Sequence, residues 1–347
     1  MNERVALGLF SGGLDSILAC RVIAGQGIRV VALKFVTPFF DHELLNRQAE
    51  YQEEMLRKYG LEVEVIDISE GYVRLLDQPP HGFGKHFNPC IDCKIMMLSR
   101  ARELMPRYGA SFLVTGEVLG QRPMSQRRDT LRVIERDAGC SGLLLRPLCA
   151  QLMPPTRAEL EGMVDRSQLY SFSGRGRKQQ QQLAALLGII NYPAPAGGCM
   201  LTDPNLAVRI RRYYNGLFPF GEQRAVEDIR LLAVGRQFRL DEAVWFVLGR
   251  DERENAHLVA LRGPDDWLLS MASRPGPLGL LRHARLTVAG SPEETDVVRR
   301  LAGLVVRFGK KGHGGCEEAE VVIDKGDVEE HGFFAPLPDE QFASWRI

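Results

Sequence analysis

Ser11-Gly12-Gly13-Leu14-Asp15-Ser16 is the most informative stretch of this sequence. It follows a short apolar run, Val5–Phe10, and precedes apolar residues at helical spacing as far as Ile23. The run is typical of a buried strand and the spacing of a helix. A glycine-rich turn between the two places backbone N–H groups and a helix N-terminus around an anion. Because the Lys-[Ser/Thr] pair of a Walker loop is absent, we expect a phosphate loop of another type.

Further strands and helices alternate along the next hundred residues. This order predicts right-handed βαβ units and an α/β fold with a parallel sheet covered on both faces. The expected strands are Val30–Phe35, Leu61–Ile68 and Phe112–Thr115, and the expected helices run from Asp41 to Gly60 and over Cys93–Tyr108.

The segment from Gln121 to Gly198 is less regular. We expect strands at Leu131–Glu135 and Leu143–Leu148 and helices at Thr156–Val164, with a Thr156/Glu159 capping box, and Lys178–Leu187. Asn191–Asp203 is rich in proline and glycine and predicts an irregular loop.

The pattern changes after about Asn215, where strands and helices no longer alternate. We therefore expect two domains, an α/β catalytic domain over residues 1–215 and an α+β domain over residues 216–347. The elements expected in the second are strands at Gln237–Leu240, Ala243–Leu248, Trp267–Ala272 and Ala319–Ile323, and helices at Arg253–Leu261 and Glu293–Leu304.

Composition favours a globular cytoplasmic enzyme. The chain has 347 residues, 45% of them hydrophobic, and a formal net charge of zero. No apolar run approaches the roughly 20 residues that span a membrane, and the N-terminus lacks the pattern of a secretory signal. Seven cysteines, an odd number, do not predict a disulfide framework. In a reducing compartment we expect them in the core, as ligands or as nucleophiles.

Basic residues gather in four short segments: Arg122–Arg132, Arg175–Lys178, Arg209–Arg212 and Arg307–Lys311. Each by itself is typical of a solvated face. Neutral net charge does not exclude nucleic acid, because the position of the charges decides binding. The segment Ser173–Gln179 either lines the phosphate cleft or forms a flexible basic loop.

The hexapeptide at residues 11–16 resembles the PP-loop of the ATP-pyrophosphatase superfamily, whose fold is of the adenine nucleotide alpha hydrolase type and whose members cleave ATP between the α- and β-phosphates. The resemblance implies that ATP and Mg²⁺ bind here and that Asp15 is catalytic, orienting the pyrophosphate through Mg²⁺ or water. The second strand would face the adenine through its backbone, and the Thr115-Gly116-Glu117 turn would add a nucleotide contact. The implied binding residues are Ser11, Gly12, Gly13, Asp15, Ser16, Leu33, Phe35 and Gly116.

Three cysteines carry a second resemblance. Asn88-Pro89-Cys90-Ile91-Asp92-Cys93 and Pro195-Ala196-Gly197-Gly198-Cys199, with Thr115-Gly116-Glu117, resemble motifs of the tRNA 4-thiouridine and 2-thiouridine synthetases. In the iron–sulfur branch of that family, three cysteines hold a [4Fe-4S] cluster whose fourth iron stays open to sulfide. The resemblance implies that Cys90, Cys93 and Cys199 are the ligands and that Cys199 is catalytic.

Two other interpretations of the three cysteines stay open. A structural zinc would need a fourth ligand, which His81 or His86 could supply. In a cluster-free mechanism Cys199 would carry a persulfide, and Cys93 would resolve it by forming a disulfide. Cys20 and Cys149 are expected in the core, and Cys140 and Cys316 in turns without an assigned role.

The C-terminal part resembles the NFACT-type RNA-binding domain in two segments, residues 247–255 and 308–314. The 4-thiouridine synthetases carry an RNA-binding region ahead of the PP-loop, whereas this PP-loop begins at residue 11, so we expect the C-terminal domain to replace it. A dimerisation or core-completing role is the alternative.

The resemblances together imply an ATP-dependent tRNA sulfurtransferase. A uracil carbonyl oxygen would be adenylated, and sulfur would replace it with loss of AMP. The expected partners are tRNA, ATP and either sulfide or a sulfur-donor protein, with no membrane. The alternatives are a PP-loop enzyme that adenylates a small molecule and holds zinc, and a non-catalytic RNA-binding or sulfur-relay protein.

Overall fold

The structure is a computed structural model that describes residues 4–194, 199–219, 224–310 and 318–347. The chain divides into two compact units, Met1–Asp203 and Pro204–Ile347. The helix α8 (Pro204–Tyr214) belongs to the second unit. The boundary that we predicted at residues 215/216 therefore lies one helix too far along the chain.

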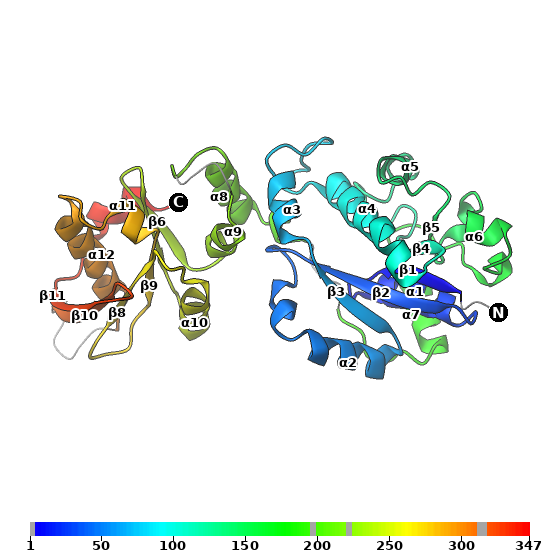
Figure 1. The fold of residues 1–347 in the computed structure, drawn as a ribbon, viewed down its shortest axis with the longest axis horizontal. Helices are drawn as coiled ribbons and strands as arrows, with labels where there is room; N and C mark the ends of the chain where they lie inside the picture. The colour runs from blue at the N-terminus through cyan, green and yellow to red at the C-terminus, as the bar shows by residue number, and fades with distance from the viewer. Residues whose placement is uncertain (1–3, 195–198, 220–223, 311–317) are drawn as a thin grey trace. The chain divides into compact units, whose positions relative to one another are not determined.

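The N-terminal unit is built on a five-stranded parallel sheet of order β3-β2-β1-β4-β5 (Figure 1). Right-handed crossovers from β1 to β2 and from β3 back to β4 place their helices on opposite faces of such a sheet. The α/β prediction is confirmed. The strands are β1 (Val5–Leu9), β2 (Arg29–Val36), β3 (Glu62–Asp67), β4 (Phe112–Thr115) and β5 (Leu144–Leu145).

Among the helices that cover this sheet, α1, α4 and α7 begin and end close to the predicted residues, whereas α3 was not predicted. The α-helices are α1 (Leu14–Ala24), α2 (Gln48–Tyr59), α3 (Ser69–Leu75), α4 (Cys90–Tyr108), α5 (Arg128–Asp137), α6 (Arg157–Leu160) and α7 (Lys178–Leu186). The 3₁₀ turns are η1 (His42–Asn46), η2 (Ala150–Leu152), η3 (Arg166–Gln168) and η4 (Met200–Thr202).

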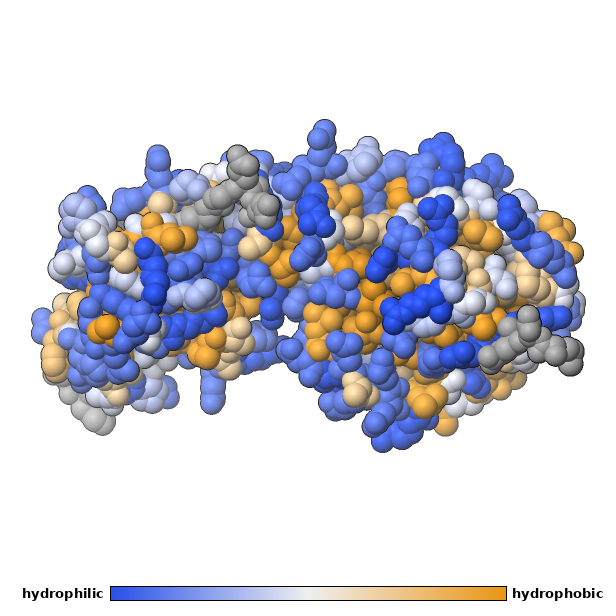
Figure 2. All heavy atoms as spheres, viewed as in Figure 1, coloured by the Kyte–Doolittle hydropathy of each residue, from blue (hydrophilic) through white to orange (hydrophobic). Residues whose placement is uncertain are grey.

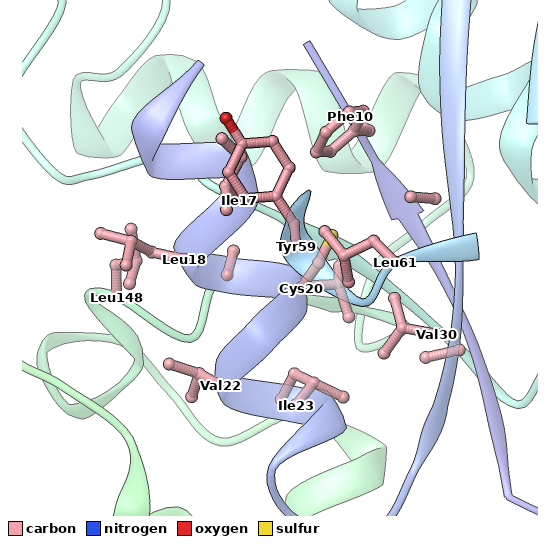
Figure 3. Packing of buried hydrophobic residues seen from close by; sticks show 14 of the residues in the cluster. Phe10, Ile17, Leu18, Cys20, Val22, Ile23, Val30, Tyr59, Leu61 and Leu148 are labelled. Carbon is pink, nitrogen blue, oxygen red and sulfur yellow. The ribbon is translucent and has the colours of Figure 1, made fainter. Parts of the chain in front are cut away.

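The buried face of α1 anchors the core beside the phosphate loop (Figure 3). Ile17, Leu18 and Cys20 are fully or almost fully buried and pack with Phe10 and Val30. The fit is tight, because a Cβ on Gly8 of β1 would lie 2.7 Å from the Cys20 sulfur. The expected core position of Cys20 is confirmed.

Several local predictions are wrong. The helix expected from Asp41 to Gly60 is the turn η1 followed by α2, because the backbone of Arg47 is not helical (φ −141°, ψ 38°). The strand expected at Leu131–Glu135 lies inside α5: Leu131 and Ile134 are buried one helical turn apart. Only two residues of Leu143–Leu148 pair as a strand.

In the last part of this unit, the structure differs from the prediction mainly in the length of a helix. The helix expected at Thr156–Val164 is shortened to α6, and its capping box is present, with Thr156 N–H donating to the Glu159 carboxylate at 2.7 Å. The predicted loop Asn191–Asp203 lies partly outside the described residues, which resume at Cys199 and form η4.

The C-terminal unit is an α+β domain with a six-stranded antiparallel sheet of order β11-β10-β8-β9-β7-β6. The four predicted strands are present, but β9 and β11 were not predicted. The strands are β6 (Arg236–Leu240), β7 (Val244–Leu248), β8 (Trp267–Met271), β9 (Gly279–Arg282), β10 (Ala319–Asp324) and β11 (Glu329–Phe334). The helices are α8, α9 (Val226–Leu232), α10 (Glu252–Leu261), α11 (Ala284–Thr287), α12 (Glu294–Phe308) and α13 (Asp339–Phe342), with a final 3₁₀ turn, η5 (Ala343–Trp345).

On the face drawn in Figure 2 most of each unit is hydrophilic, with apolar residues gathered in patches. Within the described ranges, no helix combines the length and the apolar character needed to cross a membrane.

Candidate active site

The phosphate loop joins the carboxyl end of β1 to the first turn of α1. Gly12 has a φ of 82°, a left-handed conformation that glycine adopts without strain. The Ser16 hydroxyl donates to the Gly13 carbonyl at 2.8 Å, and the Gly13 N–H donates to the Ser11 hydroxyl at 3.3 Å. The first N–H groups of a helix have no partner inside it. The loop therefore presents donors in the arrangement that suits a phosphate group.

A buried lysine of β2, Lys34, lies against this loop. Its ammonium donates to the Ser11 carbonyl at 2.8 Å and lies 2.5 Å from Asp41 Oδ2. A buried charge requires such partners, and the bond to Ser11 ties β2 to the loop. The Lys34 ammonium is therefore held next to the loop, with Asp41 as its counter-ion. Sequence reasoning missed Lys34, although a lone lysine inside an apolar strand was an available signal.

Leu33 and Phe35 flank Lys34 and are both buried. The Leu33 carbonyl accepts a hydrogen bond from Phe10 N–H at 2.9 Å within the sheet. The Leu33 carbonyl therefore already has a hydrogen-bond partner in the sheet. A contact between this strand and the adenine stays a prediction.

Asp15 connects the loop to two segments far away in sequence. Its Oδ2 accepts from Gln121 Nε2 at 2.8 Å and lies 3.5 Å from Arg177 Nη2. Its Oδ1 is buried without a hydrogen-bond partner in the part of the chain that the structure describes. Carboxylate oxygens are ligands that Mg²⁺ prefers, so this oxygen fits the expected Mg²⁺ role. The Arg177 contact also brings the basic segment Ser173–Gln179 to the loop.

At Gly116, the backbone after β4 lies very close to the backbone of the phosphate loop. A Cβ at this position would lie 2.3 Å from the Asp15 carbonyl oxygen and 2.6 Å from Ser16 N. No side chain fits between these two backbones, so Gly116 has a steric role in addition to the nucleotide contact that we expect of it.

The three expected cysteines share one neighbourhood, centred on the buried Tyr72 of α3. Burial raises the pKa of the Tyr72 phenol well above its usual range, and the sulfur atoms of Cys93, Cys199 and Cys90 raise it further. The Tyr72 hydroxyl acts on the Cys93 thiol in return and favours its thiolate, although burial has the larger effect and raises the pKa of that thiol. The fold therefore brings Cys199 near the pair Cys90 and Cys93, from which it is far away in sequence. Sequence reasoning gave no signal for Tyr72.

The local backbone explains how these thiols are presented. Cys90 is the first residue of α4, and Asn88 Nδ2 donates to its Sγ at 3.1 Å. Burial raises the pKa of the Cys93 thiol to about 12 and that of the Cys199 thiol to about 11. Both are neutral thiols at physiological pH, so a metal that binds them must displace protons.

The donor set fits a three-thiolate site better than a zinc site completed by His81. Both ring nitrogens of His81 face carboxylates, Nδ1 at 2.7 Å from Asp92 and Nε2 at 3.2 Å from Asp137. Within the described ranges no three His, Cys, Asp or Glu side chains are already arranged to hold a metal ion. The thiols would therefore have to reorient around a bound cluster.

The remaining cysteines lie elsewhere. Cys20, Cys140 and Cys149 are fully buried free thiols. Cys316 and residues 195–198, which carry most of the Pro-Ala-Gly-Gly-Cys motif, lie outside the described residues.

A buried ion network starts one residue from Cys93. Lys94 Nζ lies 3.6 Å from Glu117 Oε1, and Arg146 Nε donates to Glu117 Oε2 at 3.0 Å. Burial opposes ionisation of Glu117, but Lys94 and Arg146 outweigh it and lower the pKa of that carboxyl. Arg146 also pairs with Glu135. The network connects the cysteine site to the turn after β4.

In the C-terminal unit, residues 247–255 were expected to contact RNA, but the polar side chains of Arg250 and Asn255 bind neighbouring residues of the same unit. Arg250 pairs with Glu254, and Asn255 Oδ1 accepts from Leu278 N–H at 3.0 Å. A Cβ on Gly249 would lie 2.1 Å from Asn255 Oδ1. These residues shape the turn from β7 into α10. Most of the second expected segment, from residue 311 onward, lies outside the described residues.

Two family models match parts of the chain. Residues 2–152 match the model of the thiamine biosynthesis protein (ThiI). Residues 235–346 match the model of the NFACT protein RNA binding domain. The first match contains β1 to β5, the phosphate loop, Cys90 and Cys93, whereas Cys199 lies beyond it. Both resemblances expected from the sequence are confirmed over these ranges.

Curated relatives match less than half of the chain. A tRNA sulfurtransferase of Erwinia tasmaniensis is 32% identical over 151 residues, which is 42% of this chain and 29% of that protein. A probable tRNA sulfurtransferase of Lysinibacillus sphaericus is 29% identical over 145 residues, 41% of this chain and 34% of that protein. The chain thus matches about a third of the length of these relatives.

Among solved structures, a 4-thiouridine synthetase–RNA complex with bound ATP is similar with a TM-score of 0.34 and 19% identity, over 54% of this chain and 52% of that one. A likeness this loose carries no argument about function.

Proposed function

We propose, from the match of residues 2–152 to the ThiI family and of residues 235–346 to the NFACT RNA-binding domain, that this chain is a cytoplasmic ATP-dependent tRNA sulfurtransferase. ATP adenylates a uracil carbonyl oxygen and releases pyrophosphate. A sulfide then attacks the activated carbon, and AMP leaves with the oxygen. The N-terminal unit performs the chemistry and the C-terminal unit binds RNA.

The observation that carries the proposal is that Cys90, Cys93 and Cys199 lie near enough to Tyr72 to raise the pKa of its phenol together. The topology brings this group to the edge of the sheet that holds the phosphate loop. The phosphate loop follows the carboxyl end of β1. Helix α4 begins at Cys90 and leads back to the start of β4, so Cys90 lies at the carboxyl end of the strands as well. In open α/β sheets that edge is where ligands bind. Activation and sulfur delivery can therefore take place next to each other.

The chain's own residues have separate tasks. The loop N–H groups and hydroxyls hold the ATP phosphates, and Lys34 adds positive charge near them. Asp15 would hold Mg²⁺ through its unpartnered Oδ1, and the ion would supply positive charge to the pyrophosphate. These groups act by positioning and by electrostatic stabilisation of charge on the phosphates.

Cys90, Cys93 and Cys199 are the residues that would hold a [4Fe-4S] cluster. When bound, a cluster with three protein thiolates supplies an iron with an open position for sulfide. The Tyr72 hydroxyl would be available to donate a hydrogen bond to a cluster sulfur, because it lies near enough to Cys93 to influence the pKa of that thiol. Hydrogen bonds to cluster sulfurs help to set the reduction potential of a cluster.

The decisive functional experiment compares tRNA nucleosides, by mass spectrometry, from cells with and without this protein. Loss of one thiolated uridine, restored by the wild-type gene and not by Asp15→Ala, is the expected result. An unchanged nucleoside profile would refute tRNA as the substrate and favour a small-molecule adenylating enzyme. Normal thiolation restored by Asp15→Ala would refute the assigned nucleotide site.

A further inference from the structure

A cavity of about 210 Å³ lies beside β5, one of the two edge strands of the parallel sheet. Its walls come from α5, from the turn after β5 and from the proline-containing segment that leads into α6. Arg128 and Arg132 of α5, together with Arg146, are its basic lining residues. None of residues 11–16 lines it, so the cavity is separate from the phosphate loop.

One of the residues that line the cavity, Arg146, has a guanidinium nitrogen whose hydrogen-bond donors are unused within the described ranges. Arg146 is 2% exposed, and its Nε and Nη1 bind Glu117 and Glu135. Its Nη2 is buried and has no hydrogen-bond partner in the described part of the chain. A buried N–H without an acceptor is costly, so this atom is explained best if an anion binds in the cavity.

The rim of the cavity adds two uncompensated positive charges. Arg128 and Arg132 are exposed and lie four residues apart on α5, which places them on one face of the helix. Neither has an acidic partner among the residues that the structure describes. The lining carboxylates are already paired, Glu135 with Arg146 and Glu159 with Arg166. Three arginines around one space match the oxygens of a phosphate group.

The cavity is connected to the cysteine site through side chains. Arg146 binds Glu117, the other oxygen of Glu117 lies 3.6 Å from Lys94, and Lys94 follows Cys93 in sequence. A phosphate held here would therefore lie near the reacting centre without competing for the ATP site. Because the rim arginines are exposed, they can reach a phosphate that is carried by a large molecule.

We propose that this cavity binds a backbone phosphate of the RNA substrate and thereby positions the nucleotide to be modified. The assignment rests on the proposed function, since it takes RNA as the substrate. It adds a specific phosphate contact on the catalytic unit to the RNA binding expected of the C-terminal unit.

The test compares two double variants of the full chain. Arg128→Gln with Arg132→Gln removes the rim charges. Arg127→Gln with Arg136→Gln removes the same amount of charge at the two ends of α5, from side chains that pair with Asp129 and Asp137 and do not line the cavity. Affinity for unmodified tRNA is measured by fluorescence anisotropy between about 50 and 200 mM salt, the range over which phosphate contacts weaken strongly.

We expect the rim variant to bind tRNA about 10-fold or more weakly at low salt, with a salt slope smaller by about one, as for the loss of a phosphate contact. The control should stay within about threefold of wild type, and ATP affinity should be unchanged in both. Equal losses in the two variants, or no loss in the rim variant, would overturn the assignment.

A second arm separates RNA from free phosphate. Inorganic phosphate is titrated against the wild type and the rim variant while the melting temperature is followed. A stabilisation that is lost in the rim variant, together with unchanged tRNA affinity, would assign the cavity to a free anion and overturn the RNA proposal. The thiolation assay is independent: a confirmed phosphate contact without any thiouridine would refute only the proposed function.

Discussion

Replacing Gly116 by alanine tests whether the end of β4 fixes the phosphate loop. The added Cβ would lie 2.3 Å from the Asp15 carbonyl oxygen and 2.6 Å from Ser16 N. Since real Cβ atoms essentially never approach closer than 3.0 Å, the two backbones must separate by the difference, at least 0.7 Å. Both close partners are backbone atoms at the start of α1, so no flexible side chain can absorb the shift.

The size of the effect follows from this displacement. Overpacking of a tight contact costs about 1–3 kcal/mol, and one kcal/mol lowers Tm by about 2–4 °C in a unit of this size. We therefore expect Tm to fall by about 2–12 °C. A catalytic group misplaced by about 1 Å can lose on the order of 100-fold in rate, so we expect tRNA-dependent AMP formation to fall at least 10-fold.

The assay combines thermal melting of the full chain with AMP formation from ATP at a temperature well below the Tm of the variant. Gly176→Ala is the matched control, because a Cβ there would meet no atom within 4 Å and its φ is not positive. Wild-type melting and wild-type AMP formation in Gly116→Ala would refute the reasoning.

Three further predictions concern the ion network, the thiols and the second unit. Glu117→Gln leaves the buried Arg146 short of a partner and should cost about 3 kcal/mol. Lys94 and Arg146 outweigh burial and lower the pKa of Glu117. The stability that the Glu117 carboxylate contributes is therefore present above the ordinary pKa of a glutamate and lost as the pH falls through the lowered pKa. The urea midpoints of variant and wild type should accordingly converge in acid. In metal-free protein, burial raises the pKa of the Cys93 thiol to about 12 and that of the Cys199 thiol to about 11. Labelling of these thiols by iodoacetamide, followed by mass spectrometry, should therefore be slow near pH 7 and faster at higher pH. Rapid labelling at pH 7 would contradict the burial of the two thiols. Deleting residues 204–347 should weaken tRNA binding in anisotropy far more than ATP binding, and unchanged tRNA affinity in the folded remainder would leave the C-terminal unit without an RNA role.

The elements around the phosphate loop were predictable because their signals are local. A buried apolar run, a glycine turn and helical spacing mark β1, the loop and α1 within twenty residues. Where the signal depended on partners, prediction failed. The strand β11 is largely exposed and polar and is fixed by its pairing with β10. Leu131 and Ile134 lie three apart, which is helical spacing, and were mistaken for a strand.

The candidate site divides in the same way. Ser11–Ser16 and the three cysteines were named from motifs. Lys34, Gln121 and Tyr72 were not, because their relevance depends on contacts that only the fold creates: Gln121 meets Asp15 across 106 residues of sequence. Tyr72 is an ordinary tyrosine in sequence and becomes relevant only because Cys93 and Cys199 lie beside it.

The measurement that tests the central claim most directly is tRNA thiolation by anaerobically prepared protein, with iron counted in the same samples. Given ATP, Mg²⁺, sulfide and unmodified tRNA, wild-type protein should carry about four irons per chain and form thiouridine detectable by mass spectrometry. Alanine at Cys90, Cys93 or Cys199 should lose most of the iron and all thiouridine, whereas alanine at the buried Cys149 should lose neither. Thiouridine formed at the wild-type rate after complete removal of iron would contradict the cluster assignment, and no thiouridine from fully loaded wild-type protein would contradict the proposed function itself.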